Sequence, residues 1–152
     1  LTDSNGRPFG REQLEGKVWV ADFIFTTCAG PCPIMTARMS SLYRQFQGDD
    51  RVRFVSVTVD PENDTPTVMA AYAANLGADT GQWHFLTGPD EAIQSLGREG
   101  LKLGSGETPL IHDVHFVLVD ARGRIRGYYD GTDTAEVDRL AQDLSTLLDT
   151  EP

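Results

Sequence analysis

An apolar, strand-like run meets the start of a helical pattern in Phe23-Ile24-Phe25-Thr26-Thr27-Cys28-Ala29-Gly30-Pro31-Cys32-Pro33. Cys28 and Cys32 are the only two cysteines of the protein. Proline is tolerated in the first turn of a helix, so Pro31 and Pro33 predict that a helix begins here. With this spacing both sulfurs lie on one side of the helix start, close enough to share a ligand or to bond to each other.

The position of the two thiols predicts chemical reactivity. Exposed N–H groups and partial positive charge at a helix start favour thiolate over thiol, and thiolates bind soft metals and exchange disulfides. A structural disulfide is the competing interpretation. Closing so small a loop stabilises a fold by only roughly 2 kcal/mol, against about 3 for a loop of fifteen residues. A chain of 152 residues can bury a core without that help.

Composition indicates one folded domain over residues 1–152. The chain is 39% hydrophobic and 24% charged, as in ordinary soluble proteins. Its net charge of -10, with scattered basic residues, argues against a nucleic-acid partner or an anionic lipid surface. No run of eighteen apolar residues is present. The chain opens at Leu1 without Met, so we expect that a targeting segment or N-terminal membrane anchor has been removed.

Strand and helix patterns alternate along the rest of the chain. A turn-rich ribbon is expected over residues 1–16, and a loop over 98–111. Strands are expected at 17–25, 52–59, 83–86, 115–120 and 124–129. Helices are expected from the cysteines to Gly48, from Thr65 to Gly77, over 90–97 and from Thr134 onward. This order predicts an α/β, thioredoxin-like fold, with a central mixed β-sheet flanked by helices and an N-terminal β-ribbon.

A metal held by the two cysteines would need a third donor. Met35, Met39 and Met69 fall at helical core spacing, so packing is the better interpretation for each. His84 lies inside a strand pattern and is expected to be half-buried or at the surface. His112 and His115 both precede a predicted strand, and residues three apart in an extended segment point to opposite sides. Spacing alone does not choose between them.

Four motifs in the right order make the chain resemble the Sco/SenC family, the extracytoplasmic copper proteins needed to assemble cytochrome c oxidase. The stretch from Phe23 to Pro33 is similar to the family's F-x-F-T-x-C-x-x-x-C-P, and Val57 to Pro66 to its S-V-D-P-E-x-D-T-P. Trp83 to Gly88 is similar to its W-x-F-L-T-G. The family's single histidine stands eleven residues before a strand-ending glycine, as His112 stands before Gly123. The resemblance covers nearly the whole chain.

The resemblance implies a copper site formed by Cys28, Cys32 and His112. Two thiolates and an imidazole are soft to borderline donors that suit Cu(I) and can also hold Cu(II). Three ligands leave a position open for a partner's donor. Asp60 matches an acidic residue that the family has near the site, but it could equally end a strand and cap the next turn. His115 is an additional possible donor.

The resemblance further implies a copper metallochaperone that delivers copper to the CuA site of cytochrome c oxidase subunit II, or to another copper or thiol partner protein. We expect a monomer in an extracytoplasmic compartment such as the periplasm, anchored to the inner membrane through an N-terminal segment.

A thiol-disulfide oxidoreductase is the alternative function. Cys28 would attack a partner disulfide and Cys32 would resolve it. The sequence departs from both families. Thioredoxin-type enzymes use W-C-x-x-C and place a proline where Val114 stands, whereas Sco proteins commonly have proline directly after the first cysteine, where this chain has Ala29. The chain also lacks the P-x-x-x-T-x-x-C pattern of peroxiredoxins. Copper delivery and thiol reduction can coexist in one protein.

Overall fold

The computed structural model describes residues 1–27, 32–103, 110 and 113–150. Across this part of the chain, six strands form one mixed sheet in the order β1-β4-β3-β2-β5-β6. Neighbouring β2, β3 and β4 run parallel, while β5 is antiparallel to β2 and β6 to β5. The strands are β1 (Thr2–Asp3), β2 (Val18–Ile24), β3 (Val52–Thr58), β4 (Trp83–Thr87), β5 (His115–Val119) and β6 (Ile125–Asp130).

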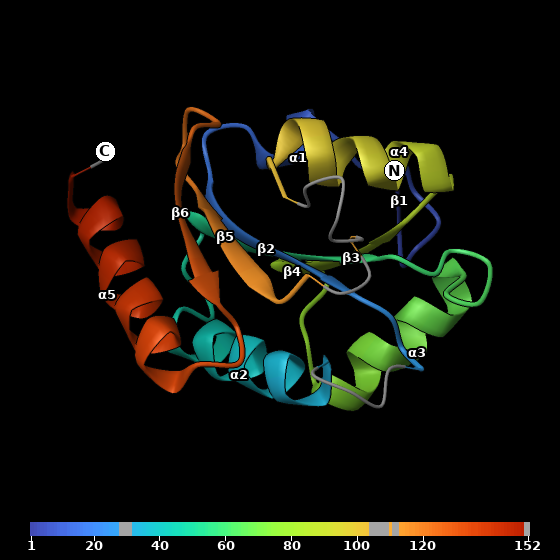
Figure 1. Cartoon of the computed structure of the whole chain (residues 1–152), viewed down its shortest axis with the longest axis horizontal. Helices are drawn as coiled ribbons and strands as arrows, with labels where there is room; N and C mark the ends of the chain where they lie inside the picture. The colour runs from blue at the N-terminus through green and yellow to red at the C-terminus, as the bar shows by residue number, and fades with distance from the viewer. Residues whose placement is uncertain (28–31, 104–109, 111–112, 151–152) are drawn as a thin grey trace.

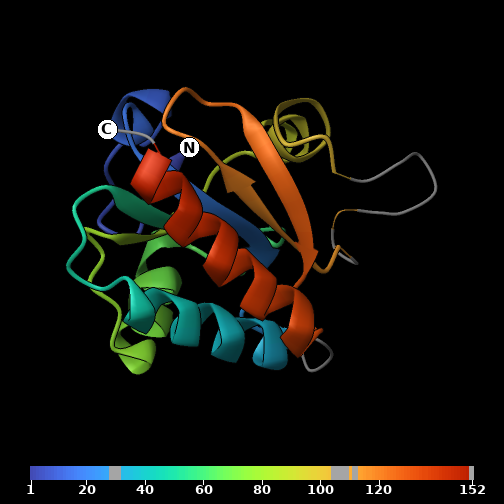
Figure 2. The same cartoon turned by 90° about the vertical axis from the view of Figure 1, so that its left-hand side faces the viewer.

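Helices cover both faces of the sheet, as Figure 1 shows. One face carries α2 (Cys32–Gln45), α3 (Pro66–Leu76) and α5 (Thr134–Thr150). The other face carries α1 (Arg11–Leu14) and α4 (Asp90–Ser95), which continues into the π-helical turn η1 (Leu96–Gly100). Figure 2 shows α5 crossing the sheet beside α2. The predicted α/β architecture, a mixed sheet flanked by helices, is confirmed.

The two central strands are buried on both of their faces. Val20 and Ile24 of β2 pack into the core cluster beneath α2 and α5, and Phe23 packs into a second cluster on the α4 side. In β3, the successive residues Phe54 and Val55 are both buried, because a parallel strand in the middle of the sheet has helices over each face.

The α3 helix begins and ends where local sequence signals predict. The Thr65 side chain accepts a hydrogen bond from the Val68 amide at 3.4 Å, and Pro66 occupies the first turn. Gly77 ends the helix with φ of 67°, a left-handed conformation that glycine adopts without steric cost. These three residues therefore act as the pattern predicts.

The N-terminal segment differs from the predicted ribbon. Thr2 bridges Pro8, but β1 pairs mainly with β4, through Thr2 and Thr87. Residues 11–14 form α1, in which the Gln13 side chain accepts a hydrogen bond from the Gly10 amide at 2.7 Å. A helix of four residues is too short to show a 3.6-residue apolar period.

The predicted loop over residues 98–111 is also partly wrong, because helical structure continues through Gly100. The Leu101 amide donates to the Leu96 carbonyl at 2.8 Å. Gly97, taken as the end of the helix, instead makes room for a neighbour. A Cβ at this position would stand 2.6 Å from Leu110, so the glycine allows the two segments to pack.

Candidate metal centre

The fold brings the chain segments around the predicted ligands to one edge of the sheet. Residues 25–27 leave the carboxyl end of β2, and α2 begins at Cys32. Because β5 runs antiparallel to β2, with Ala21 opposite Val117, its first residues lie at the same edge. Cys28 and His112 lie outside the described residues. The structure therefore places Thr27 and Asp113, the sequence neighbours of these two predicted ligands, and the backbone of Cys32 at the start of α2.

The buried carboxylate of Asp64 holds the segment that leads to Cys28. It accepts hydrogen bonds from the Thr26 amide at 3.0 Å and from the Thr26 hydroxyl. It also accepts one from the Thr58 hydroxyl, at the end of β3, at 2.6 Å. With 0% exposure, Asp64 ties together the end of β2, the end of β3 and the approach to α3. The last described residues before Cys28 are thereby fixed to the sheet.

Asp60 has a different environment from Asp64. Its amide donates to the Thr58 hydroxyl at 2.9 Å, and its carboxylate accepts from the Asn63 side chain at 2.8 Å. The Asp64 amide donates to the Asp60 carbonyl at 2.9 Å. Asp60 therefore opens the turn between β3 and α3, as one of its two sequence interpretations expects.

A groove of about 340 Å³ lies between α2 and α3 beside this edge. Thr26 and Pro33 line it at the end nearest the predicted site, and Leu76 lines it further along α3. The Thr36 and Tyr72 hydroxyls hydrogen-bond each other at 3.0 Å, which joins the first turns of α2 to α3. The helix that starts at Cys32 is thus supported by a second helix.

The other candidate donors are engaged in packing or in other contacts. Met35, Met39 and Met69 are at most 1% exposed within the core, which confirms their role in packing. His115 contacts Asp113 through Nδ1 at 3.2 Å and stacks edge-on with Tyr128. Its strand neighbours Val117 and Val119 pack on the α4 side, so His115 faces away from α2.

His84 is half-buried in β4, as predicted, with its ring 4.6 Å from that of Phe9. Burial, reinforced by the charge of Arg53, lowers the pKa of His84 to about 4. The ring is therefore neutral at physiological pH. No described residue hydrogen-bonds its Nε2 atom.

A second buried carboxyl group, Asp22, lies in the middle of β2 with 0% exposure. Ser56, its neighbour across the β2–β3 pair, donates a hydrogen bond to it at 2.6 Å. Burial raises the pKa of Asp22 to about 7, against the smaller lowering effect of the Ser56 hydroxyl. This side chain titrates near neutrality inside the core.

Sequence reasoning missed the roles of both Asp22 and Asp64. A signal for Asp22 was available, because an acidic residue interrupts the apolar run of the strand predicted at 17–25. Asp64 stands in a motif together with Asp60, and nothing local distinguishes a buried carboxylate from an exposed one four residues away. Only the tertiary contact with Thr26 separates them.

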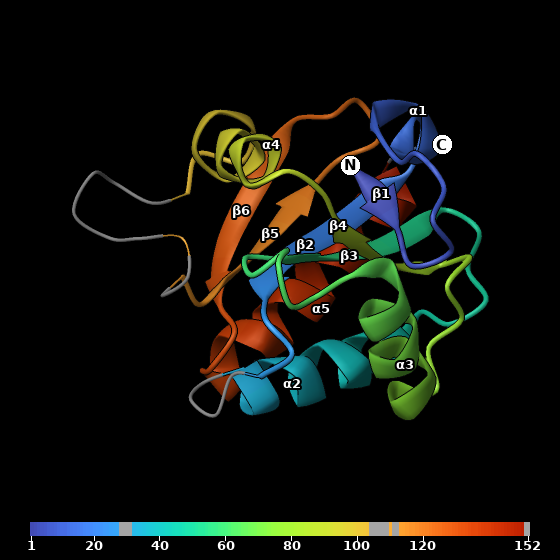
Figure 3. The same ribbon diagram turned by 90° about the vertical axis from the view of Figure 1, so that its right-hand side faces the viewer.

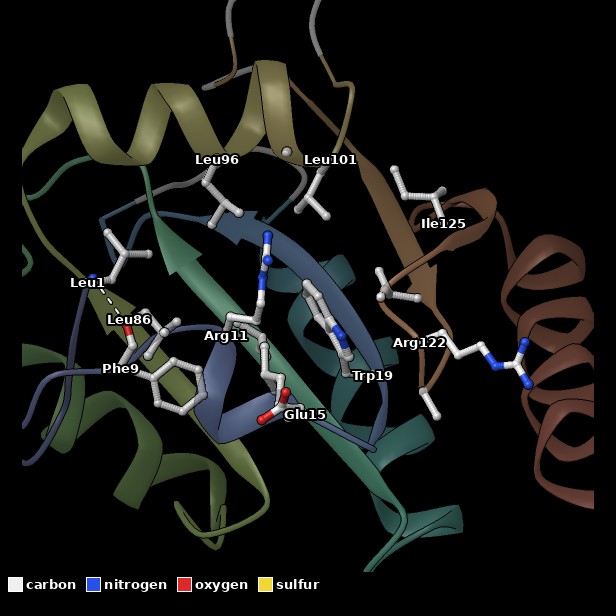
Figure 4. Close-up of a pocket in the computed structure, with 17 residues that line it drawn as sticks. Leu1, Phe9, Arg11, Glu15, Trp19, Leu86, Leu96, Leu101, Arg122 and Ile125 are labelled. Atoms are coloured by element: carbon white, nitrogen blue, oxygen red, sulfur yellow. Dashed lines mark hydrogen bonds between the residues drawn. The ribbon is translucent and has the colours of Figure 1, made fainter. Parts of the chain in front are cut away.

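A cavity of about 770 Å³ lies on the opposite face of the sheet, between α1, η1 and the β5–β6 turn (Figure 4). Its lining is largely apolar, including Trp19, Leu86 and Leu101, and Arg11 extends over it from α1. None of the described residues that line it is a cysteine or a histidine. Thr26, Pro33 and Asp113, the described residues near the predicted ligands in sequence, do not line it.

The described residues alone contain no group of three or more His, Cys, Asp and Glu side chains that could hold a metal ion. Two of the three predicted ligands lie outside that set. Among the helices the structure describes, none is long and apolar enough to cross a membrane.

Comparison with known proteins connects this geometry to a family. The model of the SCO1/SenC family matches residues 1–149. A SCO1 homologue from Bacillus subtilis (strain 168) is 35% identical over 151 residues, which cover 95% of this chain and 78% of that relative.

Solved structures show the same relationship. A SCO1/SenC family lipoprotein from Bacillus anthracis str. Ames has 34% identity and a TM-score of 0.84, over 97% of this chain and 90% of that one. BsSco, a Sco family cytochrome c oxidase assembly protein with a disulfide switch, has 34% identity and a TM-score of 0.81, over 96% and 88%. Bradyrhizobium japonicum ScoI, solved with copper bound, has 26% identity and a TM-score of 0.75, over 97% and 95%. This chain belongs to the SCO1/SenC family.

Proposed function

We propose that this protein binds one copper ion through Cys28, Cys32 and His112 and passes it to the CuA site of cytochrome c oxidase subunit II. Copper is its cargo. ScoI, at 26% identity, binds copper, and BsSco, at 34% identity, belongs to the cytochrome c oxidase assembly proteins. Two thiolates and an imidazole suit Cu(I) and can also hold Cu(II).

The observation that carries this proposal is the convergence of three chain segments at one sheet edge. Thr26 is fixed there by Asp64, α2 starts there at Cys32, and Asp113 precedes the antiparallel strand β5. The cysteines and His112 belong to these segments. A three-ligand site at an edge leaves one coordination position open, through which a partner's donor can take the ion.

The proposed location is extracytoplasmic, with the domain tethered to a membrane. The relative from Bacillus anthracis is a lipoprotein. A net charge of -10 keeps such a domain off an anionic lipid surface and favours a partner with basic residues around its copper site.

Thiol-disulfide exchange through Cys28 and Cys32 is the second candidate function. The observation that favours it is the disulfide switch of BsSco, at 34% identity to this chain. In this reaction the Cys28 thiolate attacks a partner disulfide, and Cys32 then displaces the partner's second thiol as the Cys28–Cys32 bond forms.

Copper stoichiometry and visible absorption test the proposal. The reduced protein is loaded with Cu(I) or Cu(II) beside the variants Cys28→Ser, Cys32→Ser and His112→Ala. We expect one copper per chain in the parent, with thiolate-to-Cu(II) absorption that is lost in both cysteine variants and weakened in His112→Ala. His115→Ala is the matched control, since that ring faces Asp113 and Tyr128.

Two results would overturn parts of the proposal. A parent protein that retains no copper but exchanges its disulfide readily with a partner would leave only the oxidoreductase function. Copper that survives His112→Ala but is lost in His115→Ala would exchange the roles of the two histidines. Delivery is tested separately, by copper transfer to the apo form of the soluble subunit II domain.

A further inference from the structure

The cavity between α1 and η1 is elongated, because five neighbouring strands contribute to its floor. The residues of this floor are Leu86 of β4, Val55 of β3, Trp19 of β2, Val119 of β5 and Ile125 of β6. Trp19 pairs with Val119, and Val119 pairs with Ile125, so the floor is continuous across these strands. With about 4.8 Å between neighbouring strands, it is roughly 19 Å long.

The apolar surface of this cavity is incompletely covered by the protein itself. In the described part of the chain, six partly buried apolar side chains pack against the core cluster on this face of the sheet. Five of the six line the cavity: Leu1, Leu14, Trp19, Leu96 and Ile125. Apolar surface that stays in contact with water favours the binding of an apolar molecule. The volume of about 770 Å³ lies within the range of small-molecule sites.

Arg11 places a positive charge beside this apolar surface. Its guanidinium extends over the cavity from α1, between Leu96 and Trp19 (Figure 4). No hydrogen bond or ion pair with another described residue engages the guanidinium. Because Arg11 is also exposed, an anion bound to it keeps part of its contact with water and avoids the full cost of desolvation.

The two other charged side chains of the lining point elsewhere. Glu15 follows Arg11 by four residues, and Figure 4 shows its carboxylate directed away from the Arg11 guanidinium. The Arg122 guanidinium extends away from the cavity at the turn between β5 and β6. Arg11 is therefore the charged group that a molecule in the cavity meets.

We propose that this cavity binds a free fatty acid, with its alkyl chain along the floor of five strands and its carboxylate paired with Arg11. Leucine, valine and isoleucine dominate the lining, and a flexible alkyl chain can follow an elongated aliphatic surface. A compact ring system would cover only part of that length. The inference is independent of the proposed copper site.

The alkyl chain and the charge contribute unequally to the expected affinity. Burial of each further methylene group should lower the Kd roughly fourfold. Pairing with an exposed guanidinium should lower the Kd by at most about fivefold. The length of the chain therefore sets the affinity, and Arg11 selects a carboxylate among amphiphiles of equal length.

Tryptophan fluorescence measures this binding, because the two tryptophans lie on opposite faces of the sheet. Trp19 is half-buried and lines the cavity, whereas Trp83 is 1% exposed in the core cluster beneath α2 and α5. Copper-free protein is titrated with octanoate, decanoate and dodecanoate below the concentrations at which they form micelles. We expect emission to shift to shorter wavelength, with the Kd falling roughly fourfold per added methylene. Trp19→Phe keeps the lining apolar and should lose the shift while calorimetry still detects binding.

Two arginine variants test the charge, since each removes one positive charge from the same lining. Arg11→Gln should raise the Kd of decanoate by about three- to fivefold and leave that of decanol unchanged. Arg122→Gln is the matched control and should bind both as the parent does, because its guanidinium points away. Decyltrimethylammonium, a cation with the same alkyl chain, should bind the parent more weakly than decanoate. Arg11→Gln should lose this preference.

Four results would overturn the fatty-acid proposal. The first is the absence of both an emission shift and binding heat with dodecanoate, and the second is an equal effect of Arg11→Gln and Arg122→Gln on decanoate. A shift that follows protein concentration without ligand, together with a dimer in sedimentation, would assign the cavity to a second copy of the chain. A shift with neutral phospholipid vesicles but not with decanoate would assign it to a membrane. All of these measurements use copper-free protein, so none of them tests the proposed copper function.

Discussion

The Asp64 carboxylate accepts hydrogen bonds from both the amide and the hydroxyl of Thr26, two residues before Cys28. These bonds join the segment before α3 to the segment that follows β2. The Thr58 hydroxyl of β3 donates a further hydrogen bond to the same carboxylate at 2.6 Å. A buried carboxylate with three donors gives the segment one well-defined position. Replacing a residue that orients metal ligands through hydrogen bonds, without itself binding the metal, typically changes the metal affinity by 10- to 100-fold.

We therefore predict that Asp64→Asn weakens Cu(I) binding by about tenfold, because its amide group would face hydroxyl donors with N–H groups of its own. Affinity is measured by competition with a Cu(I) chelator. Thr26→Val, which removes the hydroxyl donor, should weaken binding in the same direction. Asp120→Asn is the control: Asp120 is equally buried but pairs with Arg124 and Arg126 at the opposite end of β5, so its replacement should lower the free energy of unfolding and leave the copper affinity near that of the parent. Parent-like affinity in Asp64→Asn would show that the segment does not depend on this anchor.

The methionines of the core should be replaceable without loss of copper. Met35 and Met39 are at most 1% exposed and pack against the sheet. Met35→Leu and Met39→Leu conserve volume, so each should cost less than about 1.5 kcal/mol of unfolding free energy. Both variants should bind one copper per chain, as measured by metal analysis after desalting. Loss of copper from a well-folded Met35→Leu protein would make its thioether a ligand.

His84 should make the fold sensitive to acid. Its pKa is lowered to about 4 in the folded protein from an ordinary 6.5, chiefly by burial, so the unfolded chain gains this proton first as the pH falls. Neutral His84 makes its full contribution to the free energy of unfolding above about pH 6.5. This contribution is lost as the pH falls toward 4, and the loss is roughly 2 kcal/mol at pH 5. His84→Gln should remove this part of the acid dependence in urea unfolding. His115→Gln, at a side chain that is 46% exposed, is the control and should not.

Asp22 should give a pH dependence of the opposite sign. Its folded pKa of about 7 exceeds the ordinary 3.8, so the unfolded chain loses this proton first as the pH rises. Stability is highest when Asp22 is protonated and falls between about pH 4 and pH 7, by roughly 4 kcal/mol in all. Asp22→Asn should therefore unfold at higher urea than the parent at about pH 8, an advantage that disappears near pH 4. A variant that is less stable than the parent throughout this range would contradict the assignment of the burial effect.

Local chemistry explains which elements the sequence could predict. For α3, an N-cap, a proline in the first turn and a left-handed glycine lie within the helix or directly beside it, and the observed helix follows them. The partner of β1 could not be predicted in this way, because pairing with β4 depends on residues far along the chain. Gly97 shows a second limit of prediction from the sequence. The same residue type can end a helix or admit a neighbour, and only the position of Leu110 distinguishes the two.

The candidate site was also only partly predictable from the sequence. Its proposed ligands were identified from spacing and family resemblance, whereas the buried carboxyl groups Asp64 and Asp22 were not. The role of Asp64 depends on Thr26, and the ionisation of Asp22 depends on burial and on Ser56. Such effects arise from tertiary contacts, and a linear pattern carries no information about which carboxyl group will be desolvated.

The pairing of β2 with β5 also sets an order of assembly. Ala21 pairs with Val117, and most of the chain lies between them in the sequence. Closing the loop between these two residues therefore has a large entropic cost, and it can occur only after the whole central region has been synthesised. The segment with both cysteines can form with β3 and α2 much earlier. A newly made chain thus carries both cysteines well before β5 can pair with β2. Under the proposed copper site, the docking of β5 is the step that brings the histidine segment to the thiols and completes the ligand set.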